Sequence, residues 1–229
     1  MALGAQEPFV RWRTLADQMG AGLYKDTAMK MRTAVVAVGA MLLLTACNTQ
    51  DNLTTTRFVT PSATGVINIG LQDAQSRVYT TPFDSRSGYA FQIGQIPNEG
   101  LFAVAGLLPG STVTAPPTGS ASYSGTHNLV IVSGISMDND SIGGFARGYS
   151  GDLTLLANFA NGNVVSVPGS ALTVDGTATG RNLSGTVTFE GVEGDLRGLI
   201  GGDDAIGAFH GEGNDDTYMF AGGFIAGRN

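Results

Sequence analysis

Cysteine is almost absent from this sequence, since Cys47 is the only one among 229 residues. A single cysteine cannot form an internal disulfide, and it cannot build a thiolate metal site alone. Charge is also scarce, because only 14% of the residues are Asp, Glu, Lys or Arg. A helical protein usually carries more of these residues, in a pattern that repeats roughly every 3.6 positions. The composition therefore disfavours a helical fold, and the 34 glycines favour a turn-rich β protein.

Lysine is missing after Cys47, where seven arginines and sixteen acidic residues give a net charge of −9. Such a chain repels phosphate backbones. It also has no basic stripe with interleaved aromatic residues, which nucleic-acid-binding surfaces usually show. We therefore expect no nucleic acid among its partners.

The residues before Cys47 have the three parts of a secretory signal. Residues 29–32 (MKMR) are positively charged, residues 34–44 form an uninterrupted apolar run, and residues 44–46 (LTA) end in small side chains. The run of eleven residues is too short to span a bilayer, which needs about 20. The pattern predicts a lipoprotein signal peptide at residues 29–46, because LTAC at residues 44–47 resembles the bacterial lipobox.

The lipobox resemblance implies that Cys47 is acylated, becomes the first mature residue and holds the protein to a membrane by its lipid. Residues 47–56 are then a tether, and residues 1–28 are an extension upstream of a true start at Met29 or Met31. Asn48 is not the aspartate of an inner-membrane retention signal, which favours the outer membrane. The alternative is a short buried helix whose cysteine packs in a core.

After residue 54 the chain runs in short alternating stretches, broken by Gly, Asn, Asp and Pro roughly every 8–12 residues. Clear examples are residues 65–69, 119–125 and 183–189. Alternation with a period of two places one set of side chains on a packed face and the other toward water. No stretch keeps helical periodicity, so the fold is predicted to be all-β.

A proline-rich segment at residues 108–117 separates two regions of different composition. We predict a smaller, irregular β region at residues 57–116. Residues 117–229 hold about eight to ten strand candidates, and they are predicted to form an eight-stranded antiparallel up-and-down barrel, because closure removes exposed edges. Asn-Gly, Asp-Gly and Gly-Asn pairs suit hairpin turns, and turns are predicted at residues 137–140, 161–163, 174–176, 201–204 and 212–215.

Three motifs resemble the β-barrel domain of transferrin-binding protein B. Residues 108–109 (LP) with 118–125 (TGSASYSG) resemble its opening, and residues 151–160 (GDLTLLANFA) resemble a strand that ends in DFA. Residues 205–211 and 220–224 resemble its closing hairpin. The departures are Asn158 for Asp, His210 where the family usually has Tyr, and Glu212 where it often has Pro.

The resemblance implies a single-lobe surface lipoprotein, with residues 57–116 as the handle that precedes the barrel. It also implies a host or environmental protein, or an iron- or haem-type ligand, and an outer-membrane receptor as a further partner. Aromatic side chains are predicted to fill the barrel from alternate positions; these are Tyr123, Phe159, Phe189, Phe209 and Phe224.

Candidate ligand contacts are His210, Glu212 and Tyr218. His210 and Glu212 are two residues apart, on one strand face, and make either a weak metal or haem contact or a polar pair at the surface. His127 follows a turn signal and has no visible partner. No Gly-x-Ser-x-Gly motif, calcium loop or set of metal ligands is legible, so we expect no enzyme, no metal and no cofactor.

The sequence thus predicts a non-catalytic binding lipoprotein, lipid-anchored in the outer membrane on its cell-surface or periplasmic face. One alternative is a structural or envelope-maintenance lipoprotein without a small ligand. Another is an uptake accessory that hands haem or iron to a receptor.

Overall fold

The computed structural model describes residues 54–69, 75–83, 87–96, 100–138, 141–214 and 217–229. These residues form twelve strands and no helix, so the all-β prediction is confirmed. A helix long and apolar enough to cross a membrane is accordingly absent from them. Cys47, the predicted signal peptide at residues 29–46 and the extension at residues 1–28 lie outside the described residues.

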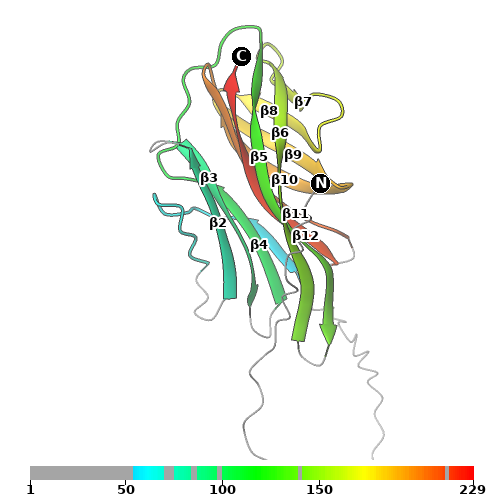
Figure 1. The fold of residues 1–229 in the computed structure, drawn as a ribbon. Helices are drawn as coiled ribbons and strands as arrows, with labels where there is room; N and C mark the ends of the chain where they lie inside the picture. The colour runs from blue at the N-terminus through cyan, green and yellow to red at the C-terminus, as the bar shows by residue number, and fades with distance from the viewer. Residues whose placement is uncertain (1–53, 70–74, 84–86, 97–99, 139–140, 215–216) are drawn as a thin grey trace, which may run out of the picture. The chain divides into compact units, whose positions relative to one another are not determined.

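Eight strands close into a barrel in the order β10-β11-β12-β5-β6-β7-β8-β9 (Figure 1). All its neighbours are antiparallel, and β12 closes the barrel against β5. The predicted eight-stranded up-and-down barrel is therefore confirmed. Its strands are β5 (Ser120–Asp138), β6 (Ser141–Asn158), β7 (Asn163–Ser166), β8 (Leu172–Thr179), β9 (Asn182–Phe189), β10 (Val192–Ile200), β11 (Asp204–Glu212) and β12 (Tyr218–Arg228).

A smaller four-stranded sheet, the handle sheet, precedes the barrel in the order β1-β4-β3-β2. Its strands are β1 (Thr54–Phe58), β2 (Gln75–Phe83), β3 (Ser87–Ile96) and β4 (Gly100–Leu107). The parallel β1–β4 pair stands beside two antiparallel pairs. Residues 108–119 then connect β4 to β5.

Residues 65–69, which the alternation predicted as a strand, form none. Gly65 has a φ of 80° in a turn in which the Ser62 Oγ accepts a hydrogen bond from the Val66 amide at 3.0 Å. Ile67 then packs with Phe102 and Val104 on one face of the handle sheet. The alternation in residues 65–69 therefore reflects an irregular segment that packs one side of its chain on the sheet, which has the same period of two as a half-buried strand.

Large apolar side chains fill the barrel. Tyr123, Phe209 and Phe224 are fully buried there and Phe189 nearly so, as predicted. Phe159 follows the end of β6 and packs against the edge of this core, where it is only partly buried. Phe220 is a core residue that the prediction missed. The Tyr123 hydroxyl donates a hydrogen bond to the Gly201 carbonyl, which satisfies its polar end.

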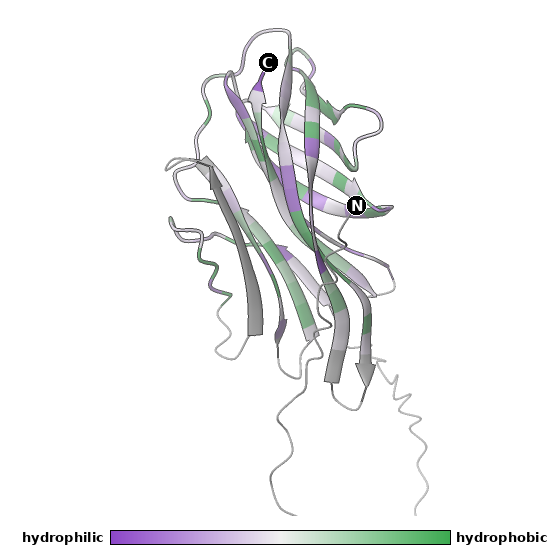
Figure 2. Cartoon of the chain, viewed as in Figure 1, coloured by the Kyte–Doolittle hydropathy of each residue, from purple (hydrophilic) through white to green (hydrophobic). Residues whose placement is uncertain are grey.

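A second core lies between the barrel wall and the handle sheet, because β11 and β12 are buried on both faces. Figure 2 shows hydrophobic residues on the strands of both sheets. The handle sheet contributes Tyr89, Phe91, Ile93, Leu101, Ala103 and Ala105, and the barrel contributes Val130, Val132, Ile135, Ile206, Ala208, Met219 and Ala221. The Asn128 Nδ2 also donates to the Tyr89 hydroxyl at 3.1 Å.

Two predictions about strand length were wrong for one reason. β5 and β6 run for 19 and 18 residues, although glycines suggested several short stretches. Asp175 and Gly176, predicted as a turn, lie inside β8, and Gly176 pairs with Gly185 of β9. A Cβ on Gly185 would lie 2.2 Å from the Asp175 carbonyl oxygen. These glycines therefore mark close approach between strands rather than turns.

Replacing Gly223 by Ala is expected to destabilise the protein by about 1–3 kcal/mol, the usual cost of overpacking a core. The new Cβ would lie 2.2 Å from Cδ2 of the buried Tyr89 and 2.6 Å from the Gly207 carbonyl oxygen. Gly227→Ala, in the same strand, is the control, because the nearest atom to its Cβ is the Asp204 Oδ1 at 3.7 Å. Urea unfolding of both variants gives the comparison; equal stabilities would contradict the tight interface.

Candidate functional site

The three predicted contact residues do not converge on one site. Ile206 and Ala208 of β11 belong to the core under the handle sheet, so His210 and Glu212, at the next alternate positions, share that outer face. Tyr218 of β12 packs instead against the core inside the barrel. The wall of the barrel therefore separates Tyr218 from the other two side chains, and they cannot bind one haem or metal together.

His210 is only 4% exposed, so the expected polar pair at the surface is wrong. Its ring centre lies 4.3 Å from that of Phe58 on β1, and the Arg197 Cζ lies 4.5 Å from the centre of the same Phe58 ring. Neither ring nitrogen of His210 has a hydrogen-bond partner among the described residues, and the Glu212 Oε2 is likewise buried and unpaired there. This arrangement fits a structural contact between barrel and handle sheet.

Burial lowers the pKa of His210 from 6.5 to about 4, because a charged imidazolium is poorly solvated at this interface. Asp195, which faces His210 across β10 and β11, opposes this and favours the proton, while Arg197 disfavours it. The histidine is therefore neutral near pH 7.

His127 lies in the middle of β5 and is 1% exposed, so its predicted place after a turn is wrong. Its ring occupies the space above Gly151 of β6, where a Cβ would come 2.7 Å from the imidazole Cε1. Burial lowers its pKa, against the opposing effects of the Asp152 carboxylate and a hydrogen bond with the Asp152 backbone. No group of three or more His, Cys, Asp or Glu side chains in the described residues is placed to hold a metal.

Tyr218 belongs to a group at one end of the barrel, the mouth cluster of Arg147, Tyr149, Phe189, Glu190 and Tyr218. The Tyr218 hydroxyl donates to the Glu190 Oε2 at 3.4 Å, and the Arg147 Nη1 donates to the Tyr149 hydroxyl at 3.3 Å. The Tyr149 and Phe189 rings meet edge to face at 5.3 Å. Burial, and secondly the Glu190 charge, raises the pKa of the Tyr218 phenol.

Sequence reasoning missed most of the mouth cluster, because its members come from three strands and one turn. Glu190 is the one described non-glycine residue with a positive φ, at 50°, in the turn between β9 and β10. Only the pairing of Arg147 with Tyr149 could have been predicted from the sequence, because residues two apart on a strand share a face.

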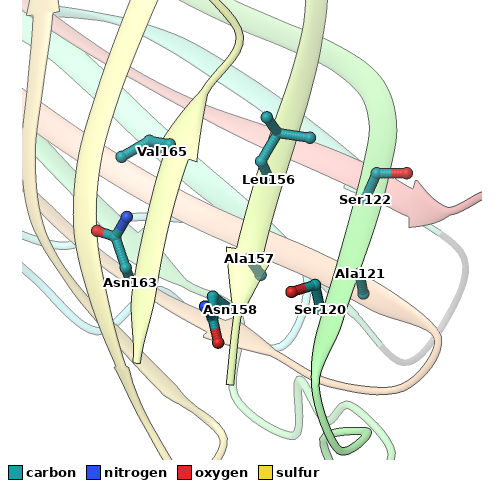
Figure 3. Close-up of a pocket in the computed structure, with 8 residues that line it drawn as sticks. All are labelled: Ser120, Ala121, Ser122, Leu156, Ala157, Asn158, Asn163 and Val165. Atoms are coloured by element: carbon teal, nitrogen blue, oxygen red, sulfur yellow. The ribbon is translucent and has the colours of Figure 1, made fainter. Parts of the chain in front are cut away.

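A groove of about 490 Å³ opens on the barrel near the C-terminal end of β6 (Figure 3). We call it the outer-wall groove; it is lined by Ser120, Ala121, Ser122, Leu156, Ala157, Asn158, Asn163 and Val165. Leu156 is 45% exposed and is the largest apolar side chain of the lining. The Asn229 Nδ2 donates to the Ser122 Oγ at 2.9 Å and fixes one rim.

The lining of the outer-wall groove offers hydrogen bonds and apolar contact. Its hydroxyl and amide groups can donate and accept hydrogen bonds, and Leu156 and Val165 offer apolar contact. None of its lining residues is ionisable. A serine nucleophile needs an adjacent general base, and this lining holds none.

No protein-family model and no curated protein sequence matches the chain. Solved structures do. A surface lipoprotein shares 14% identity over 70% of this chain and 82% of its own, with a TM-score of 0.41. The haemoglobin receptor HpuA from Kingella denitrificans shares 16% identity over 67% and 63% of the two chains, with a TM-score of 0.38.

The isotype 1 transferrin-binding protein B from serogroup B Neisseria meningitidis shares 16% identity, with a TM-score of 0.42. That match covers 70% of this chain and 34% of the larger protein. The resemblance to transferrin-binding protein B, predicted from the three sequence motifs, is thus found again as a resemblance between structures.

The stability of the protein is expected to fall as the pH is lowered from about 6.5 to 4. The folded-state pKa of His210, about 4, lies below its unfolded value of 6.5, so the unfolded chain takes up the proton first. The contribution of neutral His210 to the free energy of unfolding is fully present above pH 6.5. It falls by about 3 kcal/mol as the pH is lowered to 4. Urea unfolding at pH 7 and at pH 4 gives the free energy of unfolding of the parent and of His210→Leu. Between the two pH values the variant should lose about 3 kcal/mol less than the parent. An equal loss in both proteins would exclude His210 as the cause.

Proposed function

We propose that this protein is a non-catalytic, lipid-anchored binding protein of the outer membrane, and that its ligand is a protein met by the outer-wall groove. The observation that carries the proposal is this groove, which exposes Leu156 between hydroxyl and amide groups. Apolar contact with a few placed polar groups is the usual composition of a binding surface.

The interior of the barrel supports a ligand outside it. Aromatic and aliphatic side chains from all eight strands fill that interior, including Tyr123, Phe209, Phe220 and Phe224. Eight-stranded barrels have an interior just wide enough to be filled in this way or to hold one small ligand. Here the described residues take up the space that a haem would need.

The shape of the groove favours a protein ligand over a small one. Small-molecule sites bury most of their ligand in a concave pocket, whereas this groove lies on the outer wall, over β5, β6 and β7. It also lacks the ionisable groups that would fix a metal ion or a carboxylate. The haem- and iron-handling alternative needs His210 or a tyrosine as ligand; His210 is buried against Phe58, and the Tyr218 hydroxyl donates to Glu190.

The lipid anchor is supported by the lipobox-like residues 44–47, which lie outside the described residues. Anchoring at Cys47 leaves the intervening residues as a spacer between the membrane and β1, whose first residue is Thr54. An outer-membrane receptor remains a partner that the resemblance to transferrin-binding protein B implies.

Leu156→Glu is expected to weaken protein binding at least tenfold, because it places a charge in the apolar part of the groove. The probes are transferrin, because the sequence resembles transferrin-binding protein B, and haemoglobin, because a haem-type ligand was predicted. Surface plasmon resonance gives the affinity for each. Val66→Glu is the matched control, since Val66 is an exposed apolar residue outside the groove. If the parent binds neither probe, the proposed ligand class is wrong. If both variants lose binding equally, the proposed groove is wrong.

Replacing Cys47 by Ala is expected to abolish incorporation of labelled palmitate, because Cys47 is the only thiol in the chain. Cells expressing the parent and the variant are labelled, and the immunoprecipitated protein is counted. Protease treatment of intact cells then identifies the face of the membrane: cleavage indicates the cell surface, and protection the periplasm. Labelling that persists in the variant would refute lipidation at Cys47.

A further inference from the structure

Strand β6 has one open edge. It pairs with β5 along almost its whole length, but with β7 only from Leu155 to Asn158. The last backbone contact on the β7 side is the Val167 amide, which donates to the Thr154 carbonyl at 3.0 Å. From Arg147 to Leu153, no strand in the described part of the chain pairs with this side of β6.

The open edge presents regularly spaced hydrogen-bonding groups. In an antiparallel strand, the N–H and C=O groups of alternate residues point to opposite edges. Since the Thr154 carbonyl points to the open edge, the backbone groups of Asp152, Ser150 and Gly148 point there too. Ser150 and Gly148 are exposed, so a second strand can reach these groups.

This edge has only part of the usual protection. Natural edge strands are guarded by charged side chains, above all lysine, and by proline, bulges or short length. Residues 141–154 contain no lysine and no proline, their only charged residues are Arg147 and Asp152, and the bulge in this hairpin lies where β5 shifts register between Ser133 and Ser136. The β5–β6 hairpin also extends past the last β12 pair, which is Tyr218 with Ser133 (Figure 1). A long edge with only two charged residues and no proline is suited to strand pairing with another chain.

We propose that the open edge of β6 pairs antiparallel with the same edge of a second copy of this chain, about a two-fold axis at Gly148. In this register Gly148 faces its own counterpart, and Arg147 lies opposite the partner's Tyr149. Phe145, which is 57% exposed, comes opposite the partner's Gly151, where the His127 ring fills the space above the glycine. The interface is then isologous, as in most homodimers.

The side chains of the edge match this register. Arg147 already hydrogen-bonds to Tyr149 within one chain at 3.3 Å, and guanidinium groups bind phenol rings and hydroxyls favourably. On the opposite face Ala146 meets Ser150, and Gly144 meets Asp152, so neither bulk nor like charge collides. A shift that centres the axis on Arg147 would instead oppose two guanidinium groups, which is destabilising.

Single cysteines test the register in the full chain. Residues in a hydrogen-bonded antiparallel pair have Cα atoms about 5.5 Å apart, within disulfide range. No atom lies within 4 Å of a Cβ built on Gly148, so Gly148→Cys fits the fold. In Ser150→Cys the two cysteines would be four residues apart along the strands, about 13 Å, so this variant is the matched control.

After mild oxidation of membranes from expressing cells, Gly148→Cys should give a dimer on a non-reducing gel that reductant removes. Ser150→Cys and the parent, whose only cysteine is Cys47, should stay monomeric. No dimer from Gly148→Cys, or equal dimer from Ser150→Cys, would overturn the proposal.

Sedimentation in density-matched detergent gives a second measurement that needs no cysteine. The parent and Gly148→Ala should have the mass of a dimer, because both keep the amide that points to the open edge. Gly148→Pro should be monomeric, because it lacks this amide while edge strands tolerate proline. A monomeric parent, or a dimeric Gly148→Pro, would exclude pairing through this edge.

Discussion

The burial of β11 and β12 on both faces is the constraint on which the rest of the structure depends. An antiparallel sheet commonly faces a core on one side and water on the other. Here consecutive residues of β11, such as Ala208 and Phe209, are both fully buried, Phe209 inside the barrel and Ala208 under the handle sheet. The barrel therefore needs the handle sheet to cover β11 and β12, because without it the outer wall would expose a continuous apolar surface.

That double burial also determines which residues can act in recognition. It draws His210 into an apolar interface against Phe58 and removes it from contact with ligands. The same barrel wall directs Tyr218 to the inner side, where it joins Tyr149 and Glu190 at the mouth of the barrel. The outer-wall groove and the open edge of β6 involve other residues of β5, β6 and β7 than Val130, Val132 and Ile135 of β5, which pack under the handle sheet.

Glycine explains most of the differences between the predicted and the observed strands. In the sequence, Asp175-Gly176 gives the same turn signal as Asn161-Gly162, which forms a true turn. The structure places the first pair within β8 and gives Gly162 a φ of 79° in the turn after β6. Only the position of the neighbouring strand distinguishes the two cases, and a local pattern contains no information about that neighbour. Phe159 is a related case, because its alternation continues past the last residue of β6.

Local patterns in the sequence were sufficient for the class of fold and most of the aromatic core of the barrel, because each depends on alternation and turn chemistry over a few residues. They also predict a lipid anchor at Cys47 from a contiguous signal, and this stays a prediction because Cys47 lies outside the described residues. Tertiary structure alone decided that His210 and Tyr218 lie on opposite sides of the wall, that the handle sheet covers β11 and β12, and that β7 is too short to cover the edge of β6. These features arise from the register and length of strands that pair far apart in sequence, and side-chain alternation within one strand does not specify its partner.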